Sequence, residues 1–260
     1  MRVVRVQYKG SVFFGALQDD GVMCLNHQLG LKDPIPLADL AILPVVAPSK
    51  IICAGMNYRD HAAEIGFPVP DEPVFFLKAP TAVIGSGQPI LVPQGVGRVD
   101  YEGELALVVG RQCRNLSPDA VPANIFGYTC ANDVTARDLQ RRDGLFGRCK
   151  GFDSFCPVGP WIETDLPDTA NLAVRTLVNG EVRQQGNTAD MLFTPNELVS
   201  AISRVMTLLP GDLILTGTPV GIGPIVPGDE VRVEIEQVGL LLNPVLAAPD
   251  GDEHAEVPLQ

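Results

Sequence analysis

Histidine is scarce in this sequence, and cysteine pairs at zinc-ligand spacing are absent. Only His27, His61 and His254 occur, and no two of the six cysteines form a C-x-x-C spacing. A zinc site built from cysteine and histidine is therefore not expected.

Basic side chains are also in deficit. Lysine and arginine together number 19 against 31 aspartates and glutamates, which gives a formal net charge of −12. Because contacts to phosphates need a basic surface, we expect no nucleic-acid partner.

The sequence also contains no internal repeat.

Long apolar runs are missing as well. None reaches the length of a membrane-spanning helix, and the alternating start of the chain lacks the apolar segment of a signal peptide. We therefore expect a cytoplasmic protein with no membrane partner. Its cysteines should be reduced and buried.

The character of the chain changes near residue 48. Residues 1–48 hold short alternating runs separated by turns, which predicts a small N-terminal β-meander domain. Residues 49–246 hold longer apolar runs broken by glycine and proline, and these two residue types number 26 and 23 in the whole chain. That density is typical of a sheet-rich fold with tight turns, so we predict a β-rich α+β class. Residues 247–260 are predicted to form an acidic tail.

Strands are predicted at the apolar runs and helices where apolar residues recur at helical spacing. The predicted strands are 51–55, 74–78, 102–109, 125–131, 172–178, 213–216 and 230–236, and the predicted helices are 57–65, 135–142 and 195–207.

Two glutamates open the strand predicted at 102–109. Glu102 and Glu104 are two residues apart, so on a strand their side chains point to the same face. Two like charges on a half-buried face repel unless a proton or a cation neutralises them, and carboxylates are the ligands that hard divalent cations prefer. The alternative interpretation is a solvated strand face.

Another acidic residue, Asp133, lies where an apolar strand gives way to a predicted helix. Side chains at such a junction often face a cleft. Helix capping is the alternative role, because aspartate caps helices well.

A histidine and a glutamate share one helix face. His61 and Glu64 are three residues apart, and a carboxylate beside an imidazole orients the ring and raises its basicity, as a general base requires. The alternative is a surface ion pair of little energetic value.

Two further segments carry polar groups that can face a ligand. Lys150, followed by a glycine and an aromatic residue, can reach a substrate carboxylate or an enolate, or can simply be solvated. Residues 216–223 are glycine-rich but lack the lysine of a P-loop, which argues against a nucleotide. Their backbone N–H groups and the Thr218 hydroxyl can contact an anion.

Together and in this order, these elements resemble the fumarylacetoacetate hydrolase superfamily. The resemblance extends over about residues 50–245. The matching segments are N-Y-x-x-H-A-x-E at 57–64, P-V-F-F-L-K at 73–78, E-x-E-L-A at 102–106, N-D-x-T-A-R-D-x-Q at 132–140, K-x-F-D at 150–153 and L-T-G-T-P-x-G-I-G at 215–223.

The resemblance implies a mixed β-sandwich roll around a cleft that holds one Mg²⁺ or Mn²⁺ ion per chain. It also implies a mobile lid at 59–73 and a homodimer. By the same resemblance the metal ligands are Glu102, Glu104 and Asp133, the catalytic residues are His61, Glu64 and Lys150, and the substrate-binding residues are Arg137, Gln140 and Thr218.

The activity implied is C–C bond cleavage or rearrangement of small 2-oxo or β-diketo acids through a metal-bound enolate. Acylpyruvate-type hydrolysis and oxaloacetate-type decarboxylation fit this description. Isomerisation or decarboxylation of hydroxy-diene dioates in aromatic catabolism is an alternative. A non-catalytic binder of small anions and a purely structural sheet protein are the alternatives from other classes.

Two positions leave the branch of the family open. Asp100 and Tyr101 precede the first glutamate, where several close members carry histidine. Arg141 and Arg142 can contact a second substrate carboxylate or belong to an exposed basic loop.

Overall fold

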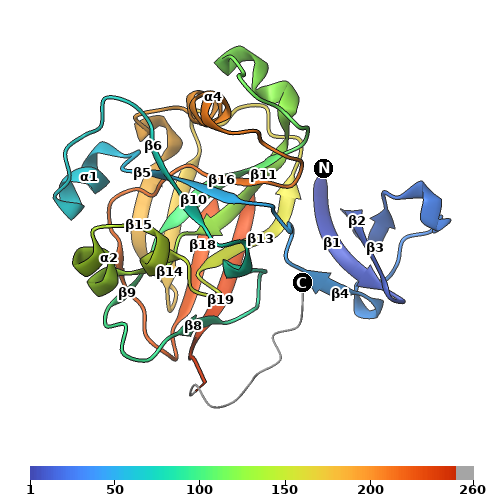
Figure 1. Cartoon of the computed structure of the whole chain (residues 1–260). Helices are drawn as coiled ribbons and strands as arrows, with labels where there is room; N and C mark the ends of the chain where they lie inside the picture. Colours follow the sequence, from blue (N-terminus) through green and yellow to red (C-terminus); the bar gives the residue numbers. More distant parts are fainter. Residues whose placement is uncertain (250–260) are drawn as a thin grey trace.

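The computed structural model describes residues 1–249, which form a β-rich molecule with four short α-helices (Figure 1). This confirms the predicted class and the mixed β-sandwich roll. The helices are α1 (Arg59–Ile65), α2 (Arg137–Asp143), α3 (Gly147–Lys150) and α4 (Pro195–Val205), and the single 3₁₀ turns are His27–Leu29, Leu37–Asp39, Pro80–Ala82, Pro118–Ala120, Pro122–Asn124 and Thr188–Asp190.

The largest sheet runs in the order β3-β2-β1-β13-β11-β10-β16-β5-β6, with β4 beside β1 and β7 beside β13. It is mixed, because β16 pairs with β5 in parallel and most other neighbours are antiparallel. Its strands are β1 (Arg2–Tyr8), β2 (Ser11–Gln18), β3 (Gly21–Cys24), β4 (Ala41–Leu43), β5 (Ile51–Gly55), β6 (Val74–Lys78), β7 (Val83–Ile84), β10 (Gly103–Val109), β11 (Ile125–Asn132), β13 (Cys156–Glu163) and β16 (Leu213–Leu215).

A second sheet packs against the middle of the first, where β10, β11 and β13 lie over β14, β18 and β19. Apolar side chains that alternate along both sheets, such as Leu105 and Val233, fill the space between them. The strands of this sheet are β8 (Ile90–Val92), β14 (Ala173–Val178), β15 (Glu181–Asn187), β18 (Glu230–Ile235) and β19 (Gly239–Ala247), and a small third sheet holds β9 (Val99–Tyr101), β12 (Thr135–Ala136) and β17 (Gly223–Pro224).

Helix α4 packs its apolar residues Val199 and Ile202 against Leu107 of β10 in a separate cluster. The helix begins with a capping box, because Thr194 and Glu197 each accept a hydrogen bond from the other's backbone N–H.

The first three strands form a meander whose own core includes Val6, Phe13 and Val22. Strand β1 also pairs with β13, so the meander continues the large sheet. A domain boundary at residue 48 stays a prediction. The predicted acidic tail lies outside the described residues from position 250 onward.

The structure also corrects some predicted elements. Strands β13 and β19 were not predicted, because their prolines argue against strands. The helix expected at 135–142 begins only at Arg137, because Thr135 and Ala136 pair with β9. All six cysteines are buried and unpaired, as predicted. No helix within residues 1–249 is long and apolar enough to span a bilayer.

Candidate active site

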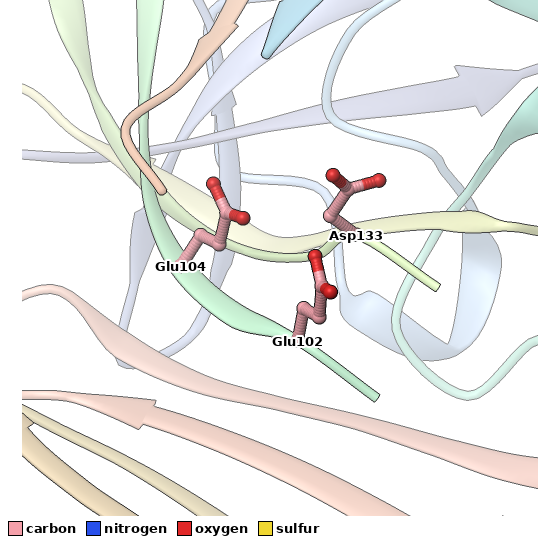
Figure 2. Close-up of side chains that lie close together, drawn as sticks. All are labelled: Glu102, Glu104 and Asp133. Carbon is pink, nitrogen blue, oxygen red and sulfur yellow. The ribbon is translucent and has the colours of Figure 1, made fainter. Parts of the chain in front are cut away.

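Three buried carboxylates meet at the junction of β10 and β11. Glu102, Glu104 and Asp133 each place an oxygen within 4.8 Å of the other two, and their side chains point into one space (Figure 2). The strand register explains this, since Gly103 pairs with Asn132 and so sets Asp133 opposite Glu102. The Asp133 N–H donates to the Glu102 carbonyl oxygen at 2.8 Å. Sequence alternation therefore placed the two glutamates correctly, and Asp133 joins them from the neighbouring strand.

Asp133 is not a helix cap. The residue that caps α2 is Ala136, and the Asp133 carboxylate instead accepts from the ammonium groups of Lys78 (2.5 Å) and Lys150 (2.6 Å). Both lysines are buried, so neither is the solvated lysine of the alternative interpretation. The Lys150 ammonium also donates to Glu102 at 2.8 Å and to Thr135 at 2.8 Å.

A fourth buried acid, Asp100, lies beside this cluster and accepts from Arg98 and Arg137. The Arg137 guanidinium donates as well to Glu102 and to Gln140. Asp100, Glu102, Glu104 and Asp133 thus face three buried cations, the ammonium groups of Lys78 and Lys150 and the guanidinium of Arg137. The partly exposed Arg98 also pairs with Asp100, so four acids face four cations in all.

The two glutamates differ in their contacts with these cations. Burial disfavours charge on Glu102, but the nearby Arg137 and Lys150 outweigh burial and hold its pKa below the usual value. Burial also raises the pKa of Glu104, and repulsion from Asp133 and Glu102 raises it further. The N–H of Gly217, 2.6 Å from Glu104, offsets only part of this. Without a bound cation, Glu104 therefore holds a proton more readily than Glu102.

The two cations that touch Glu102 remain charged. Burial opposes their charge, but carboxylates raise the pKa of Lys150, through Asp133 and Glu102, and that of Arg137, through Glu102 and Asp100. The site therefore contains fixed positive charge next to its carboxylates.

Helix α1 brings His61 and Glu64 together over the same site. The His61 Nδ1 lies 3.1 Å from Glu64 Oε2, and His61 is only 5% exposed. The other carboxylate oxygen, Oε1, accepts from the N–H of Gly221 at 3.0 Å. Each carboxylate oxygen of Glu64 thus has a hydrogen-bond partner, and the buried His61 does not form the surface ion pair of the alternative interpretation.

The three carboxylates, His61 and Lys150 line one narrow, partly open cavity of about 30 Å³. That volume accommodates an ion or a water molecule and is too small for a dicarboxylic acid. Apolar side chains complete the wall, with the rings of Phe76 and Phe146 4.9 Å apart and Lys150 lying over Phe76. Substrate entry therefore requires movement of part of the wall, and α1 supplies His61 and Ile65 to it.

The three residues predicted to bind substrate lie at the same cavity. Arg137, Gln140 and Thr218 all line the cavity. The Thr218 hydroxyl already donates to the Gly103 carbonyl and accepts from Gln184. The substrate-binding roles of these residues stay predictions.

Two arginines of α2, whose role the sequence left undecided, do not line the cavity. Arg141 and Arg142 have more than 60% of their side-chain surface exposed and pair with Asp138 and Asp143. They are exposed, as the alternative of an exposed basic loop requires, but they lie in helix α2 and not in a loop.

Sequence reasoning assigned no role to Lys78 and Asp100. Lys78 ends the apolar strand β6, and the only available signal was its place in the matched segment 73–78. Asp100 was noted only as a departure from close family members. Both contacts join positions more than 30 residues apart in the sequence, which local patterns do not reveal.

Comparison with known proteins shows to which family the chain is similar. Residues 50–246 match the family described as fumarylacetoacetate (FAA) hydrolase C-terminal. The mitochondrial oxaloacetate tautomerase FAHD2A of Homo sapiens is 42% identical over 226 residues, which cover 82% of this chain and 71% of that protein.

Solved structures are similar over almost the whole chain. The 5-carboxymethyl-2-hydroxymuconate delta-isomerase from Mycobacterium smegmatis has a TM-score of 0.86 and 45% identity, covering 96% of this chain and 100% of that chain. Maleylpyruvate hydrolase from Sphingobium sp. SYK-6, in complex with manganese(II) ion and pyruvate, has a TM-score of 0.79 and 32% identity, with 96% and 100% covered.

Proposed function

This chain belongs to the fumarylacetoacetate hydrolase family, and from that premise we propose that it is a divalent-metal-dependent enzyme that forms and reprotonates the enolate of a small 2-oxo-acid. One observation carries the proposal. Three buried carboxylates and His61, which is paired with Glu64, line the same cavity.

The residues present fit a hard divalent cation. Glu102, Glu104 and Asp133 offer only carboxylate oxygens, the ligand type that Mg²⁺ and Mn²⁺ prefer, and they are close enough to share one ion. Such an ion, when bound, would supply Lewis-acid stabilisation of negative charge on the substrate oxygens. Glu104 must release its proton before it can serve as a ligand.

We assign the proton transfer to His61. Its Nδ1 is engaged by Glu64, so Nε2 is the ring nitrogen that can take a proton from the substrate carbon and return it. The Glu64 carboxylate then stabilises the imidazolium. The buried positive charge of Lys150 would stabilise the enolate oxygen, and Arg137 and Gln140 line the cavity where a substrate carboxylate would lie.

Proton relocation without C–C cleavage is the first reaction to test. A tautomerase at 42% identity and an isomerase at 45% identity support it, because both kinds of enzyme move a proton on the carbon skeleton. Hydrolysis of an acylpyruvate-type bond is the second candidate, since the same pair can deprotonate a water molecule and a hydrolase at 32% identity is among the similar structures. Oxaloacetate-type decarboxylation would use the same enolate.

The experiment is a substrate panel with the purified protein and Mn²⁺ or Mg²⁺, repeated with EDTA. The panel contains enol-oxaloacetate, a hydroxy-diene dioate and an acylpyruvate, each followed by its ultraviolet absorbance. We expect turnover that disappears with EDTA and falls about 10²–10⁴-fold in His61→Ala, the range for loss of a general base. The matched control is His27→Ala, because His27 is exposed in the N-terminal region.

The product identifies the reaction. Enol–keto conversion or double-bond migration alone would establish proton relocation, and release of two fragments would establish cleavage. Metal binding without turnover of any substrate would overturn the enzymatic proposal in favour of an anion binder. We also propose a homodimer, which light scattering would test.

A further inference from the structure

One glycine residue joins a buried tyrosine to the histidine–glutamate pair. The Tyr101 hydroxyl donates to the Gly221 carbonyl oxygen at 2.9 Å, and the Gly221 N–H, in the preceding peptide group, donates to Glu64 Oε1 at 3.0 Å. We propose that Tyr101 is a positioning residue, which holds Gly221 so that Glu64 and His61 stay aligned over the cavity. This inference rests on the proposed function, in which His61 transfers the proton.

The two oxygens of Glu64 have different partners. Oε1 accepts from the Gly221 N–H, and Oε2 faces His61 Nδ1 at 3.1 Å. The carboxylate plane, and with it the imidazole ring, therefore depends on where the Gly221 N–H points. Because a quarter of the Glu64 side-chain surface is exposed, packing alone does not fix its rotamer.

The backbone conformation at residue 221 requires glycine. Gly221 has a φ of +105°, and a Cβ there would lie 2.5 Å from the Arg183 carbonyl oxygen, so only glycine fits. Two residues later, Gly223 pairs with Tyr101 across β9 and β17, and a Cβ on Gly223 would lie 2.8 Å from the tyrosine hydroxyl oxygen. The loop thus lies directly on the Tyr101 ring.

The same loop contacts the N-terminal side of helix α1 and the carboxylate triad. Asn57, which precedes α1, donates from its side-chain amide to the Thr216 carbonyl oxygen at 2.7 Å. The next residue, Gly217, donates its N–H to Glu104. Residues 216–221 therefore hold α1 before its first turn and, through Glu64, in its last turn.

Tyr101 acts through this loop and not on the substrate. It is 3% exposed and lies in an apolar cluster, and it is not among the residues that line the cavity. Removing the tyrosine hydroxyl leaves the Gly221 carbonyl oxygen without its donor. The backbone dihedrals of Gly221 are then less constrained, so the N–H on the other side of its Cα can turn away from Glu64, and the histidine loses its fixed orientation. The expected effect is on the chemical step more than on substrate binding.

The kinetic test uses Tyr101→Phe, which keeps the ring in the core. We expect kcat to fall about tenfold, the effect of losing one hydrogen bond, with KM and Mn²⁺ affinity changed less than about twofold. The matched control is Tyr128→Phe. Tyr128 is half-buried on β11, and its hydroxyl has no hydrogen-bond partner within residues 1–249.

A double-mutant cycle separates positioning from general destabilisation. In a Glu64→Ala background, Tyr101→Phe should change kcat by less than about twofold, because the carboxylate that it positions is already gone. An equal loss in both backgrounds, or a parallel loss of Mn²⁺ affinity, would overturn the proposal and make Tyr101 a structural residue.

Amide exchange gives a readout that needs no substrate. In protein labelled with nitrogen-15 glycine, the Gly221 amide should exchange about tenfold faster in Tyr101→Phe than in the wild type, with no change in Tyr128→Phe. A Gly221 amide that exchanges freely in the wild type would overturn the proposal. Protection of this amide together with no turnover of any substrate would leave the positioning contacts intact and refute only the proposed function.

Discussion

Replacing Glu104 by glutamine should stabilise the metal-free protein while weakening metal binding. Glu104 is buried among like charges, and its raised pKa means that the native state holds a proton which the unfolded chain releases. Glutamine has the same shape and carries no charge. Its oxygen can accept the Gly217 N–H, and its amide can donate to the oxygens of Glu102 and Asp133.

The size of the effect follows from linkage. The usual glutamate pKa is 4.5. Below that value the native and unfolded states are both protonated and no stability is lost. As the pH rises toward the native pKa, stability falls by about 1.4 kcal/mol per pH unit. Glu104→Gln removes this loss, so we expect it to be more stable than the wild type at pH 8, with the difference growing from a small value at pH 5 by at most about 1.4 kcal/mol per pH unit.

The assay is urea unfolding in EDTA at pH 5 and pH 8, followed by the fluorescence of the single tryptophan, Trp161. Adding Mn²⁺ should reverse the order, because the wild type binds the ion more tightly and gains more from it. A Glu104→Gln protein that is less stable than the wild type at pH 8, or shifted equally at both pH values, would refute the reasoning.

Lys150→Met removes the ammonium that two buried carboxylates share. We therefore expect the unfolding free energy of the metal-free protein to fall by about 3–5 kcal/mol in the same urea assay, and an unfolding free energy equal to that of the wild type would contradict this. Gly217→Ala would place a Cβ 2.8 Å from the Asn57 Cβ, at a backbone φ of +94°. We expect the unfolding free energy to fall by about 1–3 kcal/mol, and an unchanged urea midpoint would contradict this. Metal binding should release the Glu104 proton, so the Mn²⁺ affinity rises with pH; calorimetry in two buffers of different ionisation enthalpy measures the protons released, and none would contradict the expectation.

Much of the fold could be predicted because its strands carry clear local signals. The apolar runs at 51–55 and 74–78 have the same bounds as β5 and β6. Strand alternation placed Glu102 and Glu104 on one face, and helical spacing placed His61 beside Glu64. These are short-range relations, which the period of a strand or helix determines.

The rest depended on contacts between distant segments. Whether two glutamates are solvated or buried depends on what packs over them, and here the covering cations come from β6, α2 and α3. Nothing local indicates that Lys78 reaches Asp133, 55 residues away. Strand β19 was missed for a different reason, since Pro244 normally argues against a strand and here it lies within a fully paired one.

The most direct test of the account is a titration of the metal-free protein with Mn²⁺, with the free ion followed by electron paramagnetic resonance. We predict one ion per chain in the wild type and in Asp119→Asn, a matched control at an exposed aspartate. Binding should weaken by at least about 100-fold in Asp133→Asn. Undiminished binding in Asp133→Asn, or no binding by the wild type, would contradict the assignment of the carboxylate triad as the metal site.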